Sequence, residues 1–472
     1  MTSPPTDPRR APGPEGILGL RNFLRFATHP LDWLRELADR YGDVVEIKIA
    51  GKPWFLVSHP EHIEEVFVKH ARVMLRDEYA EVLQRALGMG LLTSDGELWK
   101  RQRRLMAQAF IPKRIQSYAD TMVRVAESGL AQWHHGQVKN LHREMSRITL
   151  EVVAEVLFGT GVTPEETERV GAAMEVINEF FANSPEELLK LPAWVPTPRN
   201  RRVNHAIRQI DDVVYRIIAE RRAAAPRDDF LGTLLAAQDD DGVRMSDQQL
   251  RDEAITLFLA GHETTALALA HTLFLLSTHP DVERKLHREI VEVLGGRLPT
   301  AADTKQLVYT ERVLKESMRI FPPAWTTGRK VGEDVEVGGY LIPKGAQILM
   351  SQWVVHRDPR WFPNPEGFDP DRWTKEYSEV LPRYAYFPFG GGPRICIGNH
   401  FAMTEAMLLL ATIVQRFRIE LLPGQRLELK PSVTLRQKGP GLLVRLVDRG
   451  YEVQRLSTDV AGQRRGEATA GA

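Results

Sequence analysis

Residues 389–398 read Phe389-Gly-Gly-Gly-Pro-Arg-Ile-Cys-Ile-Gly398 and contain the only cysteine of the chain, Cys396. Three consecutive glycines followed by a proline cannot form the interior of a helix or of a packed strand. They predict a loop whose backbone can approach another group closely. A helical pattern of apolar residues begins at Phe401 and continues to Val414. The thiol is therefore expected just before a helix N-terminus, where free N–H groups and the helix dipole favour a thiolate.

A lone cysteine also has a purely structural explanation, since free cysteine is among the most buried residue types. The glycines, Phe389 and Arg394 argue against it, because an inert buried thiol needs none of them. A zinc site is disfavoured, since no second cysteine exists to complete a thiolate cluster. An axial ligand of haem iron requires only one thiolate. The loop therefore favours Cys396 as a metal ligand.

The pattern Phe389-x-x-Gly392-x-Arg394-x-Cys396-x-Gly398 resembles the haem-ligand signature of the cytochrome P-450 monooxygenases, with no departure at its fixed positions. The resemblance implies that Cys396 binds the iron of haem b, iron protoporphyrin IX, as a thiolate. It also implies that several residues of the loop and of the following helix lie against this cofactor. These are Pro388, Phe389, Gly390, Arg394, Gly398 and Ala402.

The composition limits the class of protein. Among 472 residues, Lys and Arg together number 62 and so do Asp and Glu, so no net field indicates nucleic acid or an anionic membrane. A single cysteine excludes an internal disulfide and fits a reducing cytoplasm. Residues 1–19 hold no long apolar run, which argues against a signal peptide or membrane anchor, and we expect them to be flexible. Residues 20–452 are expected to form one domain, followed by a flexible tail at 453–472.

Apolar periodicity predicts a mainly α-helical fold with small β-sheets, of the α+β class. A helix is expected at 30–41, and alternating residues at 45–49 and 54–57 predict a β-hairpin. Helical patterns dominate from residue 60 to about 295. Further strands are predicted at 335–337, 347–350, 427–429 and 442–446.

One predicted helix is unusually long and carries polar residues in an apolar setting. It begins with a capping box at 246–249 and continues to about Thr278, roughly 48 Å at 1.5 Å per residue. Near its middle the sequence reads Ala260-Gly-His-Glu-Thr-Thr265, where burial of Glu263 is costly without a partner. Thr264 can bond back to a carbonyl one turn earlier and distort the helix.

This stretch resembles the Ala-Gly-x-Glu/Asp-Thr motif of the cytochrome P-450 family, whose long central helix crosses over the haem. The resemblance implies that Glu263 and Thr264 relay protons to dioxygen. It also implies that Ala260 and Gly261 lie beside the cofactor. His262 falls at a variable position of the motif and receives no role.

Trp99 and Arg103 are four residues apart, so they share one helix face and can together bind a carboxylate. They resemble the Trp-x-x-x-Arg pair that holds a haem propionate in the family, and Arg329 resembles the second propionate ligand. The other cations between residues 100 and 114 form either a solvated face or a docking patch for an acidic electron carrier.

Glu316 and Arg319 are three residues apart on a predicted helix, and Arg372 follows in a proline-rich stretch. They resemble the Glu-x-x-Arg pair and partner arginine that form a buried network on the cysteine side of the haem. As an isolated surface pair, Glu316 and Arg319 would contribute little.

The resemblance also indicates the substrate side of the site. Ala324, Trp325 and Thr326, just before Arg329, would line the pocket over the haem, as would Thr434. The segment 180–202 is interrupted by prolines and resembles the mobile lid over the substrate channel of the family.

The expected function is that of a haem-thiolate monooxygenase that hydroxylates or epoxidises an apolar small molecule such as a fatty acid, terpenoid or steroid. The form of the two central motifs looks closer to fatty-acid-hydroxylating relatives than to camphor-type ones. Two electrons would come from separate proteins, a ferredoxin or flavodoxin with its reductase, and the oxygen atom from O2. No nucleic-acid partner and no membrane anchor are expected.

Two other functions fit a haem-thiolate site. A peroxygenase or rearrangement enzyme uses peroxide and needs no electron donor, and such members of the family usually lack the acid–alcohol pair. A haem sensor without catalytic activity has no need for a proton relay. The presence of Glu263 and Thr264 favours the monooxygenase.

Overall fold

The computed structural model describes residues 10–14, 19–49, 51–159, 163–181, 195–227, 229–439 and 441–450. Most of the N-terminal segment 1–19, most of the predicted lid and the whole tail 453–472 lie outside these ranges. Residues 10–14 pack against the first strand, which differs from the flexibility expected of them. Ala11 is buried, and the carbonyl of Pro12 accepts a hydrogen bond of 2.8 Å from the backbone N–H of Glu46.

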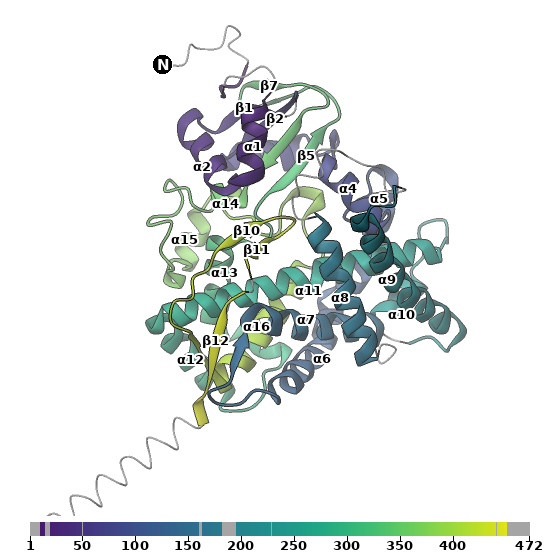
Figure 1. The fold of residues 1–472 in the computed structure, drawn as a ribbon, viewed down its shortest axis with the longest axis vertical. Helices are drawn as coiled ribbons and strands as arrows, with labels where there is room; N and C mark the ends of the chain where they lie inside the picture. The colour runs from purple at the N-terminus through teal and green to yellow at the C-terminus, as the bar shows by residue number, and fades with distance from the viewer. Residues whose placement is uncertain are drawn as a thin grey trace, which may run out of the picture.

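Helices form most of the described chain (Figure 1). They are α1 (Leu20–Thr28), α2 (Pro30–Tyr41), α3 (Pro60–Glu64), α4 (Glu78–Leu87), α5 (Gly96–Ala107), α6 (Pro112–Leu130), α7 (Leu141–Phe158), α8 (Pro164–Phe181), α9 (Pro198–Ala223), α10 (Phe230–Ala236), α11 (Asp247–Thr278), α12 (Pro280–Leu294), α13 (Val308–Ile320), α14 (Gln352–Val355), α15 (Lys375–Val380) and α16 (Asn399–Arg416). A single π-helical turn continues α3 over Glu65–Lys69.

The strands are short and gather in small sheets. They are β1 (Val44–Ile49), β2 (Lys52–Val57), β3 (Met74–Leu75), β4 (Val138–Asn140), β5 (Thr327–Val331), β6 (Val335–Val337), β7 (Tyr340–Ile342), β8 (Gln347–Met350), β9 (Phe417–Leu421), β10 (Leu429–Pro431), β11 (Leu435–Gln437) and β12 (Leu443–Asp448). The largest sheet has the order β1-β2-β8-β5-β3, and a second has the order β4-β12-β9. β6 pairs with β7, and β10 with β11. The mainly helical fold with small β-sheets is therefore confirmed.

The predicted hairpin of β1 and β2 is antiparallel, with Val45 opposite Leu56 and Ile47 opposite Trp54. On its other side β2 pairs in parallel with β8. Trp54 lies beside Gln347, although the two residues are nearly 300 positions apart in the sequence. This sheet forms the upper part of the molecule together with α1 and α2 (Figure 1). β5, in the same sheet, carries the buried side chain of Arg329.

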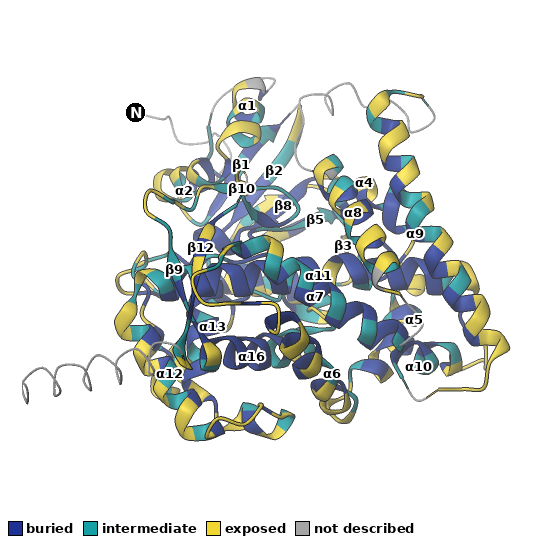
Figure 2. Ribbon diagram, turned by 60° about the horizontal axis from the view of Figure 1, so that its bottom comes forward, coloured by how far each residue is buried: buried dark blue, intermediate teal, exposed yellow. Residues whose placement is uncertain are grey.

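The long helix α11 crosses the middle of the molecule (Figure 1). Its apolar residues surround most of its circumference, so α7, α9, α13 and α16 all pack against it. Figure 2 shows that it is buried over most of its length. At its start the hydroxyl of Ser246 accepts the backbone N–H of Gln249 at 3.2 Å, while the Gln249 side chain accepts from Arg101. Only half of the predicted capping box is therefore formed.

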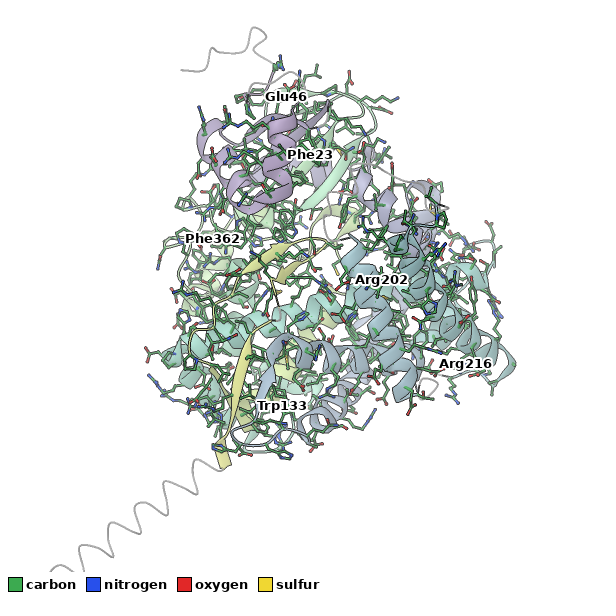
Figure 3. All side chains as sticks on the ribbon, viewed as in Figure 1. Phe23, Glu46, Trp133, Arg202, Arg216 and Phe362 are labelled. Carbon is green, nitrogen blue, oxygen red and sulfur yellow. The ribbon has the colours of Figure 1, made fainter. Side chains whose placement is uncertain are left out.

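A buried ionic network anchors α13 to the stretch that leads into the Cys396 loop. Glu316 and Arg319 are both 0% exposed, and two guanidinium nitrogens of Arg319 donate to the Glu316 carboxylate at 2.8 and 3.0 Å. Arg372 donates to the same carboxylate at 3.0 Å, and the indole N–H of Trp373 at 2.9 Å. The ring of Phe362, labelled in Figure 3, lies 5.3 Å from the Arg319 guanidinium carbon.

The remaining donors of Arg319 are also satisfied, because it donates to the carbonyls of His356, Pro365 and Gly367. One side chain thereby fixes three separate points of the irregular segment 356–367. A buried ion pair is strongly destabilised when one partner is lost, since the other charge stays buried without compensation. Glu316 is the only carboxylate that faces these two arginines among the contacts of the described residues.

Replacement of Glu316 by Ala is expected to lower the free energy of unfolding by about 3–5 kcal/mol, because it leaves Arg319 and Arg372 buried without a counter-charge. The measurement is urea denaturation of the purified protein, with Glu316→Gln as a milder variant if Glu316→Ala does not accumulate.

The matched control is Glu311→Ala on the same helix, where Glu311 pairs with Lys315 at 2.7 Å and is 41% exposed. An exposed pair contributes only about 0–1 kcal/mol. Equal losses in the two variants would show that the network does not carry the stability assigned to it.

Candidate functional site

The loop around Cys396 packs so closely against the π-helical turn that its glycines cannot carry side chains. A Cβ on Gly392 would lie 2.0 Å from the carbonyl oxygen of Phe67, and one on Gly391 would lie 2.4 Å from the Tyr384 ring. Gly392 also has a φ of +64°, in the left-handed region that favours glycine. The backbone N–H of Cys396 donates to the carbonyl of Phe389 at 3.0 Å and closes the loop. The glycines and this hydrogen bond therefore hold the backbone of Cys396 in one place.

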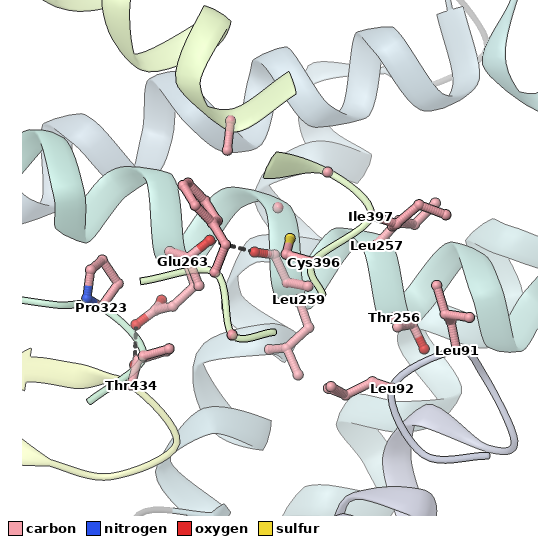
Figure 4. A pocket seen from close by; sticks show the side chains of 18 of the residues that line it. Leu91, Leu92, Thr256, Leu257, Leu259, Glu263, Pro323, Cys396, Ile397 and Thr434 are labelled. Carbon is pink, nitrogen blue, oxygen red and sulfur yellow. Dashed lines mark hydrogen bonds between the residues drawn. The ribbon is translucent and has the colours of Figure 1, made fainter. Parts of the chain in front are cut away.

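Cys396 opens into an internal cavity of about 430 Å³. Residues of α11, of the loop, of α5 and of β5 all line it. Figure 4 shows the sulfur together with Leu259 and Glu263 of α11 and with Thr434 around this cavity. All the residues predicted to lie against a cofactor line it: Trp99, Arg103, Ala260, Gly261, Arg329, Pro388, Phe389, Gly390, Arg394, Gly398 and Ala402.

Cys396 lines this cavity, and burial raises the pKa of its thiol above the usual value. The backbone N–H of Gly398 and the charge of Arg103 act in the opposite direction but do not overcome burial. The Gly398 N–H thus favours the thiolate, as expected at a helix N-terminus, but burial is the larger effect. A metal cation bound to the sulfur reverses this balance, because coordination deprotonates a thiol.

Four arginines of the described chain line the same cavity, Arg76, Arg103, Arg329 and Arg394. Burial lowers the pKa of each of them, that of Arg329 to about 10. Within the described residues no carboxylate forms an ion pair with Arg103 or Arg329, and Arg329 donates only to the carbonyl of Gly328, at 2.7 Å. The Nε of Arg76 has no partner there either. This cavity is therefore suited to a group that carries carboxylates.

The carboxylates of a haem and the iron at its centre match these two features. A porphyrin presents propionates to guanidinium groups and a cation to the thiol, so the donor set of the cavity fits the cofactor. Arg394 is also held in place by the protein, since it pairs with Asp95 and lies 4.2 Å from the Trp99 ring centroid. Arg76 would join the propionate ligands, although the sequence around it contains no motif that marked it.

On α11, Thr264 lines the cavity and its hydroxyl donates to the carbonyl of Ala260 at 2.6 Å. This is the back-bond expected from the sequence, and α11 continues as a helix through it. Glu263 also lines the cavity, but its carboxylate points to the C-terminal hairpin, which is formed by β10 and β11. It accepts from Arg436 Nε at 2.6 Å and from the Thr434 hydroxyl at 3.3 Å.

The Arg436 contact decides the charge of Glu263. Burial acts to raise the pKa of the carboxyl, but the hydrogen bond and charge of Arg436 outweigh it and lower the pKa to about 2. Glu263 is therefore ionised at neutral pH, so it can accept a proton but does not carry one. Thr434, predicted for the substrate pocket, both lines the cavity and holds Glu263.

A second carboxyl near α11 has the opposite character. Glu405 on α16 is fully buried, and burial raises its pKa to about 8, opposed only by the neighbouring Thr265 hydroxyl. It therefore keeps a proton at neutral pH. The sequence analysis did not select Glu405. It could have been found from the sequence, because it is a glutamate on the apolar face of the helix that follows Cys396.

One interpretation of the sequence needs correction. Trp325 does not line the cavity: it is 3% exposed, packs in the core beside β1 and β2, and donates its indole N–H to the carbonyl of Ser432 at 2.8 Å. Its neighbours Ala324 and Thr326 do line the cavity, as expected. Among the other cations between residues 100 and 114, Lys100 pairs with Glu97 and Arg101 with Asp239.

The described residues contain no helix that is both long and apolar enough to cross a membrane.

Replacement of Arg436 by Gln is expected to destabilise the protein by roughly 3–5 kcal/mol at neutral pH, since it leaves Glu263 buried and charged. In the parent, the pKa of Glu263 is lowered from 4.5 to about 2, so its contribution is present above pH 4.5 and is lost as the pH falls toward 2. In the variant, burial alone raises the pKa, so stability is lost as the pH rises. The difference in free energy of unfolding between the parent and the variant, measured by urea denaturation, should therefore be larger at pH 8 than at pH 5.

The control is Lys438→Gln, which breaks an exposed pair with Glu428 on the same side of the hairpin. A gap that does not depend on pH would contradict the role of Arg436. The double variant Glu263→Gln with Arg436→Met should recover much of the loss, because it removes both charges.

A family model of cytochrome P450 matches residues 11–444 of the chain. The chain is 40% identical over 433 residues to cyclooctatin synthase of Streptomyces melanosporofaciens. The alignment covers 90% of this chain and 94% of that protein. It is 34% identical over 419 residues to cyclooctat-9-en-7-ol 5-monooxygenase of the same organism, covering 88% and 90%. It is 35% identical over 417 residues to pentalenene oxygenase of Streptomyces avermitilis, covering 88% and 91%.

The fold is similar to that of retinoic acid-bound cyanobacterial CYP120A1, with a TM-score of 0.81 and 29% sequence identity over 93% of this chain and 99% of that one. The family match spans nearly the whole described domain, including the Cys396 loop, α11 and the network at Glu316. Family and fold together imply a cysteine-ligated haem in the cavity described above. On these grounds the chain belongs to the cytochrome P450 family and is a monooxygenase of that family.

Proposed function

We propose that this monooxygenase inserts one atom of O2 into an apolar terpenoid, using haem b bound through Cys396 and electrons from a separate ferredoxin or flavodoxin with its reductase. The observation that carries the proposal is one cavity shared by the Cys396 thiol, Thr264 and a largely hydrocarbon wall. The overall reaction consumes a C–H bond, O2, two electrons and two protons, and yields a C–OH group and water.

The choice of terpenoid over fatty acid is supported by the relatives. Two of them, cyclooctat-9-en-7-ol 5-monooxygenase and pentalenene oxygenase, are named as oxygenases of a terpene alcohol and of a terpene, and each matches 88% of the chain. The wall of the cavity is formed by branched aliphatic and aromatic side chains, among them Leu91, Val153, Leu157, Phe230 and Leu257.

The haem, when bound, supplies the activation of dioxygen and the oxidising power toward the substrate carbon. The Cys396 sulfur would donate electron density to the iron, and the cavity arginines would bind the propionates. Apolar side chains around the sulfur exclude water and position the substrate.

Proton supply would depend on two neighbouring residues of α11. The Thr264 hydroxyl donates to the carbonyl of Ala260, which leaves its oxygen lone pairs available to accept a hydrogen bond within the cavity. Glu263 is ionised and can receive a proton from solvent and pass it on, once its contact with Arg436 is exchanged for water. Glu405, which keeps its proton at neutral pH, would offer a second source beside Thr265.

The substrate class is tested by titrating the haem-loaded protein with terpenoids and with linear fatty acids, while the Soret band reports displacement of the sixth-ligand water. Terpenoids are expected to shift the band and to be converted to products with one added oxygen when ferredoxin, its reductase and NADPH are supplied. Shifts from linear fatty acids alone would overturn the terpenoid proposal. Turnover with peroxide but none with the donor system would establish a peroxygenase instead.

The proton-relay role predicts that Thr264→Ala separates oxygen consumption from product formation. Electrons are still consumed, but product per electron pair should fall at least tenfold, since loss of general acid–base assistance typically costs a factor of about 10²–10⁴. Thr264→Ser retains the hydroxyl and is the control that should keep most of the product yield. Parallel loss of oxygen consumption and product in Thr264→Ala would assign the residue to binding instead.

A further inference from the structure

The central stretch of α11 contains a buried histidine at a variable position of the family motif. His262 is 5% exposed, and it lies outside the lining of the cavity, unlike Glu263 and Thr264 that follow it. Its Nδ1 lies 2.7 Å from the carbonyl oxygen of Phe258. A carbonyl oxygen only accepts hydrogen bonds, so the proton of the neutral ring is on Nδ1. Nε2 therefore has a free lone pair and can accept a proton.

This lone pair lies beside the free oxygen of the Glu263 carboxylate. Arg436 Nε and the Thr434 hydroxyl both donate to Oε1, at 2.6 and 3.3 Å. Oε2 accepts no hydrogen bond from the described residues and lies 4.0 Å from His262 Nε2. Two acceptors at this distance are joined once one of them takes up a proton, or by a water molecule between them. The two atoms are therefore placed to exchange a proton.

His262, Glu263 and Thr264 lead around α11 from its outer side to the cavity. Successive residues of an α-helix are about 100° apart, so Glu263 stands between the other two. α7 covers the outer side, where the Thr149 hydroxyl donates to the carbonyl of His262 at 3.0 Å. A proton that reaches Glu263 through His262 therefore comes from the side of α7 and not through the substrate space.

A second histidine belongs to the same face of α7. His142 precedes Thr149 by seven residues, which is two helical turns. It is half-buried, and its Nε2 is buried without a partner in the described part of the chain. Burial lowers the pKa of His142, the charge of Glu263 acts to raise it, and the charges of Arg436 and His262 act to lower it. This side of α11 thus has a further group that can carry a proton and is partly open to solvent.

Glu263 alone is a poor carrier of protons from solvent. With a pKa of about 2, roughly one carboxyl in 10⁵ is protonated at pH 7. A histidine is protonated far more often at this pH, because its unperturbed pKa is about 6.5. Burial lowers the pKa of His262 and the charge of Glu263 opposes this, so the ring is neutral at rest. Once charged, it would repel the Arg436 guanidinium and loosen the contact that holds Glu263.

We propose that His262 transfers protons from solvent to Glu263 during the reduction of dioxygen, and that its Nε2 takes up and releases each proton. Oε2 of Glu263 receives the proton directly or through one water molecule, and the ring returns to its neutral Nδ1–H form. The carboxyl then releases the proton toward Thr264, so one proton enters from solvent for each proton delivered. This inference rests on the oxygen chemistry of the proposed function and does not depend on its substrate class.

The pH dependence of such a relay depends on the charged groups around His262. Among the described residues they come from its own helix and from the elements packed beside it. They are Glu263 of α11, Arg436 of β11, His142 of α7 and, acting on Arg436, the exposed Glu175 and Glu179 of α8.

The experiment follows the reduction of O2 by the haem-loaded protein without substrate, with ferredoxin, its reductase and NADPH as the electron source. Two electrons and two protons convert O2 to hydrogen peroxide, whereas four of each convert it to two molecules of water. Fast proton delivery favours water, so the fraction of electrons that reaches water measures the relay. In the parent this fraction should fall as the pH rises from 6 to 8, because fewer histidines carry a proton. A parent that reduces O2 only to peroxide would overturn the inference.

Two amide variants separate proton transfer from hydrogen bonding. His262→Asn keeps an N–H donor for the carbonyl of Phe258, and His262→Gln keeps a polar group toward Glu263, but neither amide takes up a proton. Both should lower the fraction of electrons that reaches water about fivefold or more, within the 10²–10⁴ range of general acid–base catalysis once bulk water partly replaces the relay. Both should also flatten its dependence on pH. Recovery of the parent fraction by either amide would assign His262 a structural role.

His271→Asn is the control for loss of a buried histidine. His271 is on the same helix and is 0% exposed, and its ring lies 5.2 Å from that of Phe321. This variant should keep the parent fraction and its pH dependence. A loss equal to that of the His262 variants would contradict a specific relay.

The tautomer is tested without turnover. ¹⁵N NMR of the histidine-labelled, reduced and carbon monoxide-bound protein should show His262 as a neutral Nδ1–H ring at pH 7, with the signal assigned by its absence in His262→Gln. A neutral Nε2–H ring would leave no lone pair beside Glu263 and would refute the inference.

None of these measurements uses a substrate, so their outcome is separate from that of the terpenoid titration. Parent-like behaviour of the His262 variants removes the relay and leaves terpenoid oxygenation standing. Failure of terpenoids to bind removes that substrate class and leaves the relay standing.

Discussion

The site depends on two kinds of buried charge that the protein alone does not balance. Burial raises the pKa of the Cys396 thiol, and a cation beside the sulfur acts in the opposite direction by favouring the thiolate. Arg103 and Arg329 line the same cavity with no carboxylate partner among the described residues, so they remain charged most easily beside an anion. An iron porphyrin with two propionates supplies both. The cavity is thus shaped for a group that is positive at its centre and negative at its edge, which no apolar substrate provides.

The rest of the fold holds these charges in place. The Glu316–Arg319–Arg372 network secures the irregular segment before the Cys396 loop, and the absence of side chains at Gly391 and Gly392 lets that loop press against the turn at Phe67. α11 contributes the opposite chemistry, an apolar surface with a few polar side chains at defined points. One of them, Glu263, is kept ionised by Arg436 and so links the proton route to the C-terminal hairpin.

Sequence reasoning succeeded where the functional residues lie close together along the chain. The Cys396 loop, the Ala260–Thr265 stretch and the Trp99–Arg103 pair are local patterns, and the structure brings all of them to one cavity. It failed where a residue matters only through a distant partner. Arg436 is 173 positions from Glu263, and Arg76 has no neighbouring motif. Trp325 was misassigned because a run of sequence does not say which of two successive extended residues faces a pocket.

The central claim is that Cys396 is the thiolate ligand of a haem enclosed by this cavity. The most direct measurement is the absorption spectrum of the reduced, carbon monoxide-bound protein, taken on the parent and on Cys396→His. The parent should bind one haem per chain and show the red-shifted Soret band of thiolate ligation, and the variant should show the band of a nitrogen-ligated haem. A parent spectrum of nitrogen ligation, or an unchanged spectrum in the variant, would contradict the account.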